Sequence, residues 1–150
     1  MSNVRSLVQR VHLKLERLWT DTDSMLEVMV TFAARGFVAW QQTYVYPEQL
    51  LEFAGRLREF PESASAEAAL KTGSVDPSAH DWLRLRAYVT DGLGHCALEF
   101  AAATNGTPPA SFSFQFSAPI EAASLNTLGE RLAGWATSQE KEFLFEARGT

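Results

Sequence analysis

Residues 50–60 have the sequence Leu50-Leu-Glu-Phe53-Ala-Gly-Arg-Leu57-Arg-Glu-Phe60, which gives the clearest indication of the fold. Its large apolar residues follow the three, four, three spacing that places side chains on one face of an α-helix. The same spacing returns 75 residues later, in Leu125, Leu128, Leu132 and Trp135. Each stretch follows a run with strand-like alternation, so the sequence predicts two amphipathic helices that cover a sheet.

Two explanations account for this repeat. An internal duplication would relate residues 8–60 to residues 82–138, with residues 61–81 as a linker. Alternatively, any helix that covers a sheet places apolar residues every three or four positions, so two such helices resemble each other without common origin. Both explanations stay open, and both predict the two helices.

Composition indicates one domain that spans residues 1–150. The chain is 46% hydrophobic and 21% charged, which is typical of a protein with a real core. No apolar run reaches the roughly 20 residues that span a bilayer, so no membrane contact is expected. The N-terminus lacks the apolar region of a signal peptide, and the single Cys96 cannot form an internal disulfide. We therefore expect a cytoplasmic protein.

The net charge of −5 and the pI near 5.2 argue against nucleic acid as a partner, because phosphate contacts need a concentrated basic surface. Alternating arginines and aromatic residues at 82–88 are a weak signal for single-stranded nucleic acid. The electrostatics outweigh it. The modest acidity permits a basic protein partner without demanding one.

Alternating apolar and polar residues predict six strands. They are expected at residues 11–15, 26–32 and 37–45, then at 83–89, 96–102 and 112–116. Helices should run from Pro47 to Phe60 and from about 121 or 124 to 138. The resulting order, βββα-βββα, predicts an α+β two-layer sandwich, in which an antiparallel sheet of about six strands carries both helices on one face. Leu57 and Leu132 should be buried there against Phe112, Phe114 and Phe116.

Two segments fit this scheme less well. Residues 61–80 are rich in Ser and Ala and are interpreted as a surface linker, with one helical turn across Ala66 to Leu70. The tail from Lys141 to Glu146 either adds a short edge strand or extends the second helix. The pattern does not decide between the two.

The sheet face opposite the helices is the candidate binding surface. It is unusually aromatic for a solvated face, and Tyr, Trp and Arg are the residues that most often contribute interface energy. Alternation assigns to it the candidate partner-binding residues Trp40, Gln42, Tyr44, Arg84, Arg86 and Tyr88. Alternatively, loops, the linker or a second subunit of a homodimer cover these rings, or one strand is shifted by a residue. The two arginines could also pair with Glu99 or Glu27 across the strands.

No catalytic motif accompanies this face. His95 and Cys96 are adjacent, so on a strand they point to opposite faces and cannot share a metal ion. The apolar neighbours of Cys96 suggest an inert buried thiol. There is no phosphate-binding glycine loop, nucleophile elbow or metalloprotease helix. We therefore expect no cofactor, no metal and no enzymatic activity. His12, His95 and Glu99 are the candidate residues of an alternative ligand site.

Four segments carry a resemblance at the level of strand and helix pattern. They are Gly36-Phe-Val-Ala-Trp40, Tyr46-Pro-Glu-Gln-Leu50-Leu-Glu-Phe53, Trp82-Leu-Arg-Leu-Arg86 and Gly94-His-Cys-Ala-Leu-Glu-Phe100. Over residues 11–136 the chain resembles small uncharacterised bacterial α+β domains, some of them similar to immunity proteins of polymorphic toxin systems. The resemblance implies a cytoplasmic protein that neutralises a partner by occlusion. It assigns no role to any residue, and the mild acidity departs from the strong acidity typical of immunity proteins against nucleases.

The favoured interpretation is therefore a non-enzymatic protein-binding module, in the manner of an immunity-type inhibitor. The alternative is a small-molecule-binding domain or an enzyme without recognisable motifs, with a pocket between sheet and helices or at the join of the two halves.

Overall fold

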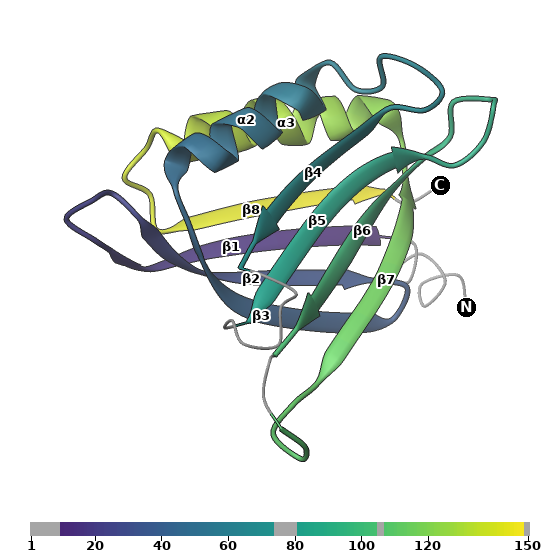
Figure 1. Ribbon diagram of the computed structural model, residues 1–150. Coiled ribbons are helices and arrows are strands. Elements are labelled where there is room, and N and C mark those ends of the chain that lie inside the picture. Colours follow the sequence, from purple (N-terminus) through teal and green to yellow (C-terminus); the bar gives the residue numbers. More distant parts are fainter. Residues whose placement is uncertain (1–9, 74–80, 105–106, 149–150) are drawn as a thin grey trace, which may run out of the picture.

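The computed structural model describes residues 10–73, 81–104 and 107–148 (Figure 1). The described elements follow one another as β1 (Arg10–Thr20), β2 (Leu26–Ala34), β3 (Phe37–Val45), α2 (Pro47–Arg58), β4 (Glu67–Thr72), β5 (Trp82–Val89), β6 (Cys96–Ala103), β7 (Ser113–Ile120), α3 (Ala122–Ala136) and β8 (Glu142–Arg148). The fold is α+β with antiparallel strands, as the sequence predicts.

The strands form two sheets rather than one. Their orders are β3-β2-β1-β8 and β4-β5-β6-β7, with four strands in each. The predicted single sheet of about six strands, and with it the order βββα-βββα, is therefore wrong. Alternation along a strand reveals which side chains point inward, but it does not reveal which strand lies alongside, so two separate meanders look like one sheet.

The two additional strands lie in the two segments that fit the predicted scheme less well, residues 61–80 and the C-terminal tail. Residues 67–72, interpreted as part of a linker with a helical turn, form β4, which pairs with β5. The C-terminal tail forms β8, which pairs with β1, so the edge-strand alternative for this tail is the observed one. Each of these strands is the next element after a helix, and each pairs with a strand of the other half.

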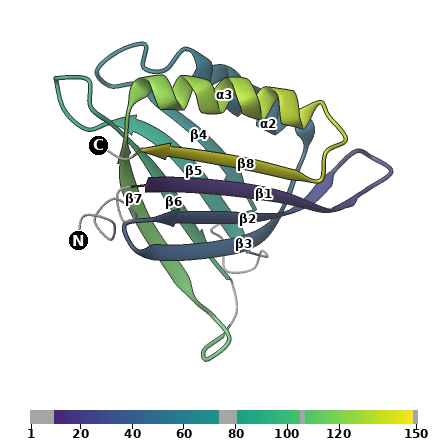
Figure 2. The ribbon, with the colours of Figure 1, turned by 180° about the vertical axis from the view of Figure 1, so that it is seen from behind.

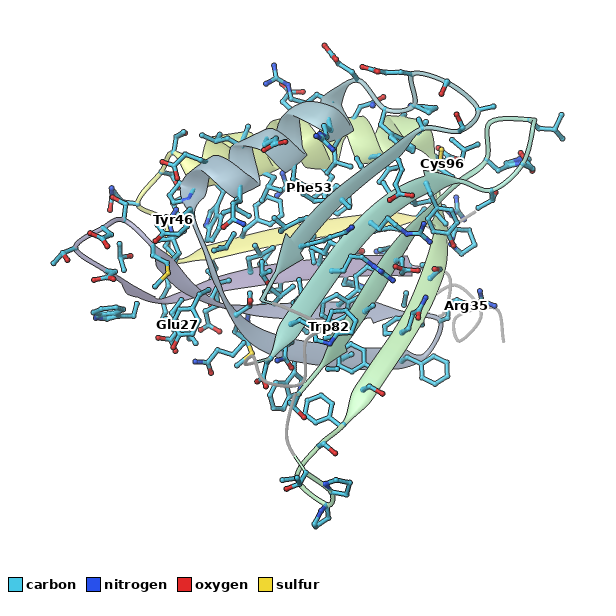
Figure 3. All side chains as sticks on the ribbon, viewed as in Figure 1. Glu27, Arg35, Tyr46, Phe53, Trp82 and Cys96 are labelled. Atoms are coloured by element: carbon cyan, nitrogen blue, oxygen red, sulfur yellow. The ribbon has the colours of Figure 1, made fainter. Side chains whose placement is uncertain are left out.

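The hydrophobic core lies between the two sheets and beneath the helices. The Phe32 ring of β2 lies 5.6 Å from the Phe100 ring of β6 and 5.2 Å from that of Phe116 on β7. Figure 3 shows Phe53 pointing from α2 toward the strands. In Figures 1 and 2 the helices lie side by side nearest to β4 and β8, whereas β3 is the strand of its sheet farthest from them.

The two helices form as predicted and pack against each other. Pro47 occupies the first turn of α2, and the Tyr46 backbone N–H donates to Gln49 Oε1 at 2.8 Å. Leu57 and Leu132 are both buried, as expected. At the contact, a Cβ added to Gly129 would lie 2.6 Å from the Ala54 carbonyl oxygen, so only glycine permits this close approach. Phe112 is 46% exposed and precedes β7, so the expected packing of the helices on Phe112 is wrong.

The halves have the same element order and the same pairing. The series β1-β2-β3-α2-β4 corresponds to β5-β6-β7-α3-β8, and the last strand of each series pairs with the first strand of the other. The offset of 75 residues holds from Pro47 to Ala122 at the helix starts and from Glu67 to Glu142 at the strand starts. This topology agrees with an internal duplication, and both explanations of the repeat stay open.

Candidate protein-binding surface

A tight hairpin places strand β3 beside β2. Arg35 and Gly36 have φ values of 55° and 81°, as in the two-residue turn that matches the twist of antiparallel strands. The turn sets Ala34 opposite Phe37, and the register continues without a shift to Leu26 and Val45. Of the described strands, only β2 pairs with β3, so one side of β3 is unpaired.

Alternation along β3 separates a buried face from an exposed one. Gln41, Thr43 and Val45 point inward and are buried, and the Thr43 hydroxyl hydrogen-bonds to that of Thr72 on β4. Trp40 and Tyr44 point outward and are 59% and 54% exposed. The outer face of β3 therefore presents two large aromatic side chains to solvent.

A groove runs between β3 and β7, and we call it the β3–β7 groove. Its volume is about 520 Å³, and it is lined by Phe37, Val38, Ala39, Trp40, Phe112, Phe114, Gln115 and Phe116. The Phe37 ring lies 6.0 Å from the Phe116 ring across the groove, and Phe112 stacks on Phe114 at 6.1 Å. Seven of these eight residues are apolar, so the groove offers little to a charged ligand.

The groove is both apolar and accessible. Phe37 is 64% exposed and Val38 is 69% exposed, and with Phe112 and Trp40 they form one contiguous apolar area. Single exposed apolar residues are common on soluble proteins, but a contiguous area bordering a groove is typical of an interaction site. This surface is the strongest candidate functional site in the described part of the chain.

The structure divides the six predicted partner-binding residues between two sheets. Trp40, Gln42 and Tyr44 share the outer face of β3, where Gln42 Nε2 donates to Glu27 Oε1. The other three residues, Arg84, Arg86 and Tyr88, lie on β5 of the other sheet. The expectation that all six lie on one face is therefore wrong, because it assumed a single sheet.

Arg84 and Arg86 of β5 belong to what we call the Glu99 cluster, which consists of Glu99, these two arginines and Gln115. Glu99 on β6 is 1% exposed. Its carboxylate accepts hydrogen bonds from Arg84 Nε at 2.9 Å, from Arg86 Nη2 at 3.2 Å and from Gln115 Nε2 at 2.9 Å. Of the two alternative partners considered for these arginines, Glu99 is the observed one and Glu27 is not, since Glu27 accepts from Gln42. The pairing with Glu99 occupies much of the hydrogen-bonding capacity of the arginines.

Electrostatics in the Glu99 cluster favour the ionised carboxylate. Burial by itself would raise the pKa of Glu99, but the hydrogen bonds from Arg86 and Gln115 and the charges of both arginines outweigh burial, so its pKa lies below the usual range. Arg86 also stacks on the Tyr88 ring at 4.3 Å, and Tyr88 donates to Ser117 Oγ at 2.9 Å. These contacts cross β5, β6 and β7 and hold the three strands together.

The alternative ligand site is not assembled. His12 on β1 contacts Glu146 of β8 at 3.5 Å, whereas His95 precedes β6 and its Nδ1 lies 2.6 Å from Asp91 Oδ2. Glu99 lies within the cluster described above. His12 belongs to one sheet and Glu99 to the other, so the expected convergence of these three residues is wrong.

Cys96 is placed as a structural thiol. Its Sγ is buried and donates to the Gly94 carbonyl oxygen at 3.4 Å. Burial, and after it the charge of Asp91, raises the pKa of Cys96, which disfavours the reactive thiolate. Figure 3 shows Cys96 at one end of its sheet and Trp82 at the other. Among the residues with described positions, no group of three His, Cys, Asp or Glu side chains could hold a metal ion.

Sequence reasoning overlooked Phe37 and Val38 and assigned Phe112 to the core. One signal could have found them, because both walls of the groove come from uncharged stretches. No charged residue occurs from Gly36 to Pro47, and none from Phe100 to Ile120. A soluble protein usually interrupts exposed strands with charges, so long uncharged runs that include an edge strand indicate contact with something other than water.

In comparisons with known proteins, no protein-family model matches the chain, and no curated protein matches its sequence. Of the helices in the three described ranges, none combines the length and the hydrophobicity that a transmembrane span requires.

Proposed function

We propose that this protein is a cytoplasmic, non-enzymatic protein-binding module that receives its partner in the β3–β7 groove. The observation that supports the proposal best is the combination of a groove of about 520 Å³ with exposed Phe37, Val38 and Phe112 at its border. In the manner of an immunity-type inhibitor, the module would act by covering a site on its partner.

Energetics favour a protein at this surface. Complete burial of one large apolar side chain stabilises a complex by about 1.5–3 kcal/mol relative to exposure. Aromatic residues that enter such a contact lose few rotamers, which is one reason why they dominate interface energies. Phe37, Trp40 and Phe112 lie within one groove, so a single partner segment can bury all three.

The Glu99 cluster contributes less to the proposed interface. Its carboxylate has partners on β5 and β7, and Arg86 is additionally stacked on Tyr88. A partner that recruited the arginines would first have to break these contacts, at the cost of leaving a buried carboxylate unpaired. The two arginines are thus better suited to a structural role than to recognition.

Selection of a displayed peptide library against the purified protein tests the proposal. We expect selected peptides to bind the Phe37→Ser and Phe112→Ser variants at least about tenfold more weakly than the original protein, because each variant loses one exposed aromatic side chain from a wall of the groove. Leu93→Ser is the matched control, because Leu93 is 84% exposed but does not line the groove. The proposal would be contradicted if all three variants lost peptide affinity equally. It would also be contradicted if both groove variants kept the affinity of the original protein.

The biological role is tested in cells once a partner is known. If the partner is a toxin, co-expression of this chain should abolish its toxicity, and Phe112→Ser should restore it. Protection that persists in Phe112→Ser at equal protein level would place the inhibitory surface elsewhere.

A second candidate function is the binding of a small apolar molecule in the same groove. The size of the groove and its apolar lining favour this candidate. The groove lies between β3 of the first half and β7 of the second half, and not between a sheet and the helices. A ligand at 100 times its dissociation constant stabilises a protein by about 2.7 kcal/mol. A thermal-shift screen with apolar metabolites should therefore reveal it, and unchanged melting temperatures would count against it.

A further inference from the structure

The unpaired side of β3 is defined by the hairpin that precedes it. In a two-residue hairpin the residues that flank the turn form a hydrogen-bonded pair, and such pairs recur at every second residue. Ala34 and Phe37 are that first pair, so Phe37, Ala39 and Gln41 use their backbone groups toward β2. The backbone N–H and C=O groups of Val38, Trp40 and Gln42 consequently point away from β2.

This edge lacks the features that normally protect one. Natural edge strands carry charged side chains, prolines or bulges that prevent pairing with another strand. β3 is nine residues long, contains neither a charged residue nor a proline, and keeps an unbroken register with β2. By contrast, the edge strand β4 contains Glu67 and Lys71, and β7 contains Pro119. β3 is therefore the most competent edge for pairing in the described structure.

The surroundings of the edge define the chemistry of what can pair with it. Val38 and Trp40 belong both to the unpaired edge and to the lining of the β3–β7 groove. The opposite wall, formed by Phe112, Phe114 and Phe116, is also uncharged. A charged side chain that entered between these walls would lose its hydration and gain no partner. The matching ligand is an extended, uncharged segment.

We propose that the partner segment is an extended peptide that adds to β3 as an antiparallel strand and lays its apolar side chains in the β3–β7 groove. This inference rests on the proposed function and specifies its binding mode, which is known from other domains as strand addition. Residues of the peptide that hydrogen-bond to Val38 and Trp40 have their side chains on the outer face, because directly opposed residues share a face. The alternate residues of the peptide face Phe37 and Phe112.

This geometry predicts which backbone N–H groups of a peptide matter. The probe is a blocked peptide in which threonine alternates with valine and phenylalanine, with a lysine at each end for solubility. Threonines should occupy the outer face and hydrogen-bond to β3. We expect N-methylation of the threonines to weaken binding at least about tenfold, and N-methylation of the apolar residues to change it less than about threefold, as measured by titration calorimetry.

A matched pair of protein variants examines the same hydrogen bonds from the other side. Val38→Pro removes a backbone N–H that points away from β2, whereas Val38→Ala keeps this N–H and, like the proline variant, loses the branched valine side chain. An edge strand tolerates proline where its N–H faces solvent. We expect Val38→Pro to bind the peptide at least about fivefold more weakly than Val38→Ala. If Val38→Pro does not fold, the two methylated peptides still decide.

Several results would overturn the inference. Equal binding of both methylated peptides would show that the groove takes apolar side chains without strand addition, and the proposed function would stand. No binding of the probe, together with library peptides that still require Phe112, would have the same meaning. A stable dimer in sedimentation that Val38→Pro dissociates would show that a second copy occupies the edge instead.

Discussion

At the scale of single residues, Glu99 shows how a charge becomes part of a core. Its side chain is 2% exposed, yet three donors from β5 and β7 surround it. A buried carboxylate without such partners would be strongly destabilising. Arg84 and Arg86 are therefore required on β5 to compensate the buried charge of Glu99. The aromatic and arginine content that suggests an interface on β5 is largely explained by this requirement.

The Glu99 cluster makes stability depend on pH in a defined direction. Because the pKa of Glu99 is lower in the folded state, its stabilisation is fully present above its unfolded pKa of about 4.5 and is lost as pH falls through the folded pKa. We expect Glu99→Gln to cost about 1–3 kcal/mol at pH 7 and to flatten the loss of stability at pH values below the unfolded pKa.

Urea unfolding at pH 7 and at acid pH measures this effect. Glu52→Gln is the control, since Glu52 is exposed on α2 and pairs with Arg56 four residues on, a contact expected to contribute less than about 0.5 kcal/mol. If the free energy of unfolding falls equally at acid pH in Glu99→Gln and in the original protein, the Glu99 cluster does not control the loss of stability at acid pH.

At the scale of elements, the two helices depend on one glycine. Gly129 and Ala54 occupy corresponding positions in the repeated spacing, and at Gly129 the helix α3 approaches the backbone of α2. A methyl group there would meet the Ala54 carbonyl oxygen, the Arg58 nitrogen and the Leu57 side chain, all within 2.8 Å. The helices could accommodate it only by moving apart.

Two glycine-to-alanine substitutions in α3 should therefore have opposite effects. Gly129→Ala should cost about 1–3 kcal/mol, because it overpacks the helix contact. Gly134→Ala should stabilise by up to about 1 kcal/mol, because nothing lies within 4 Å of the added methyl group and alanine favours the helix. Thermal and urea denaturation measure both effects. A destabilised Gly134→Ala together with an unaffected Gly129→Ala would contradict this packing.

At the scale of the whole molecule, the halves are interlocked. β4 leaves the first half to pair with β5, and β8 leaves the second half to pair with β1. Phe32 of one sheet also contacts Phe100 and Phe116 of the other. Neither sheet can separate without exposing the core of both, so the two sheets should unfold together.

Native-state hydrogen exchange tests this cooperativity. The slowest amides of β1 and β2 should exchange with the same free energy as those of β5 and β6, because only global unfolding exposes them. Exchange of one sheet at a clearly lower free energy than the other would indicate two independent units.

The groove illustrates where prediction from sequence stopped. Trp40 and Tyr44 were expected to point outward, and they do, because alternation depends only on the extended backbone. Phe112 was expected to face the core by the same rule, but it precedes β7 and is exposed, because its strand begins one residue later. Trp40 and Phe112 line one groove, although their segments belong to two sheets that share no strand. A local sequence pattern cannot predict this proximity.

The two helices, the meander strands and the burial of Leu57 and Leu132 follow from local spacing and turn residues, because both act over a few neighbours. Only the folded molecule shows that the strands form two sheets, that β4 and β8 cross between the halves, and that β3 and β7 form the groove. Strand pairing depends on which distant segments bury one another's apolar faces, and that choice is made by the whole core at once.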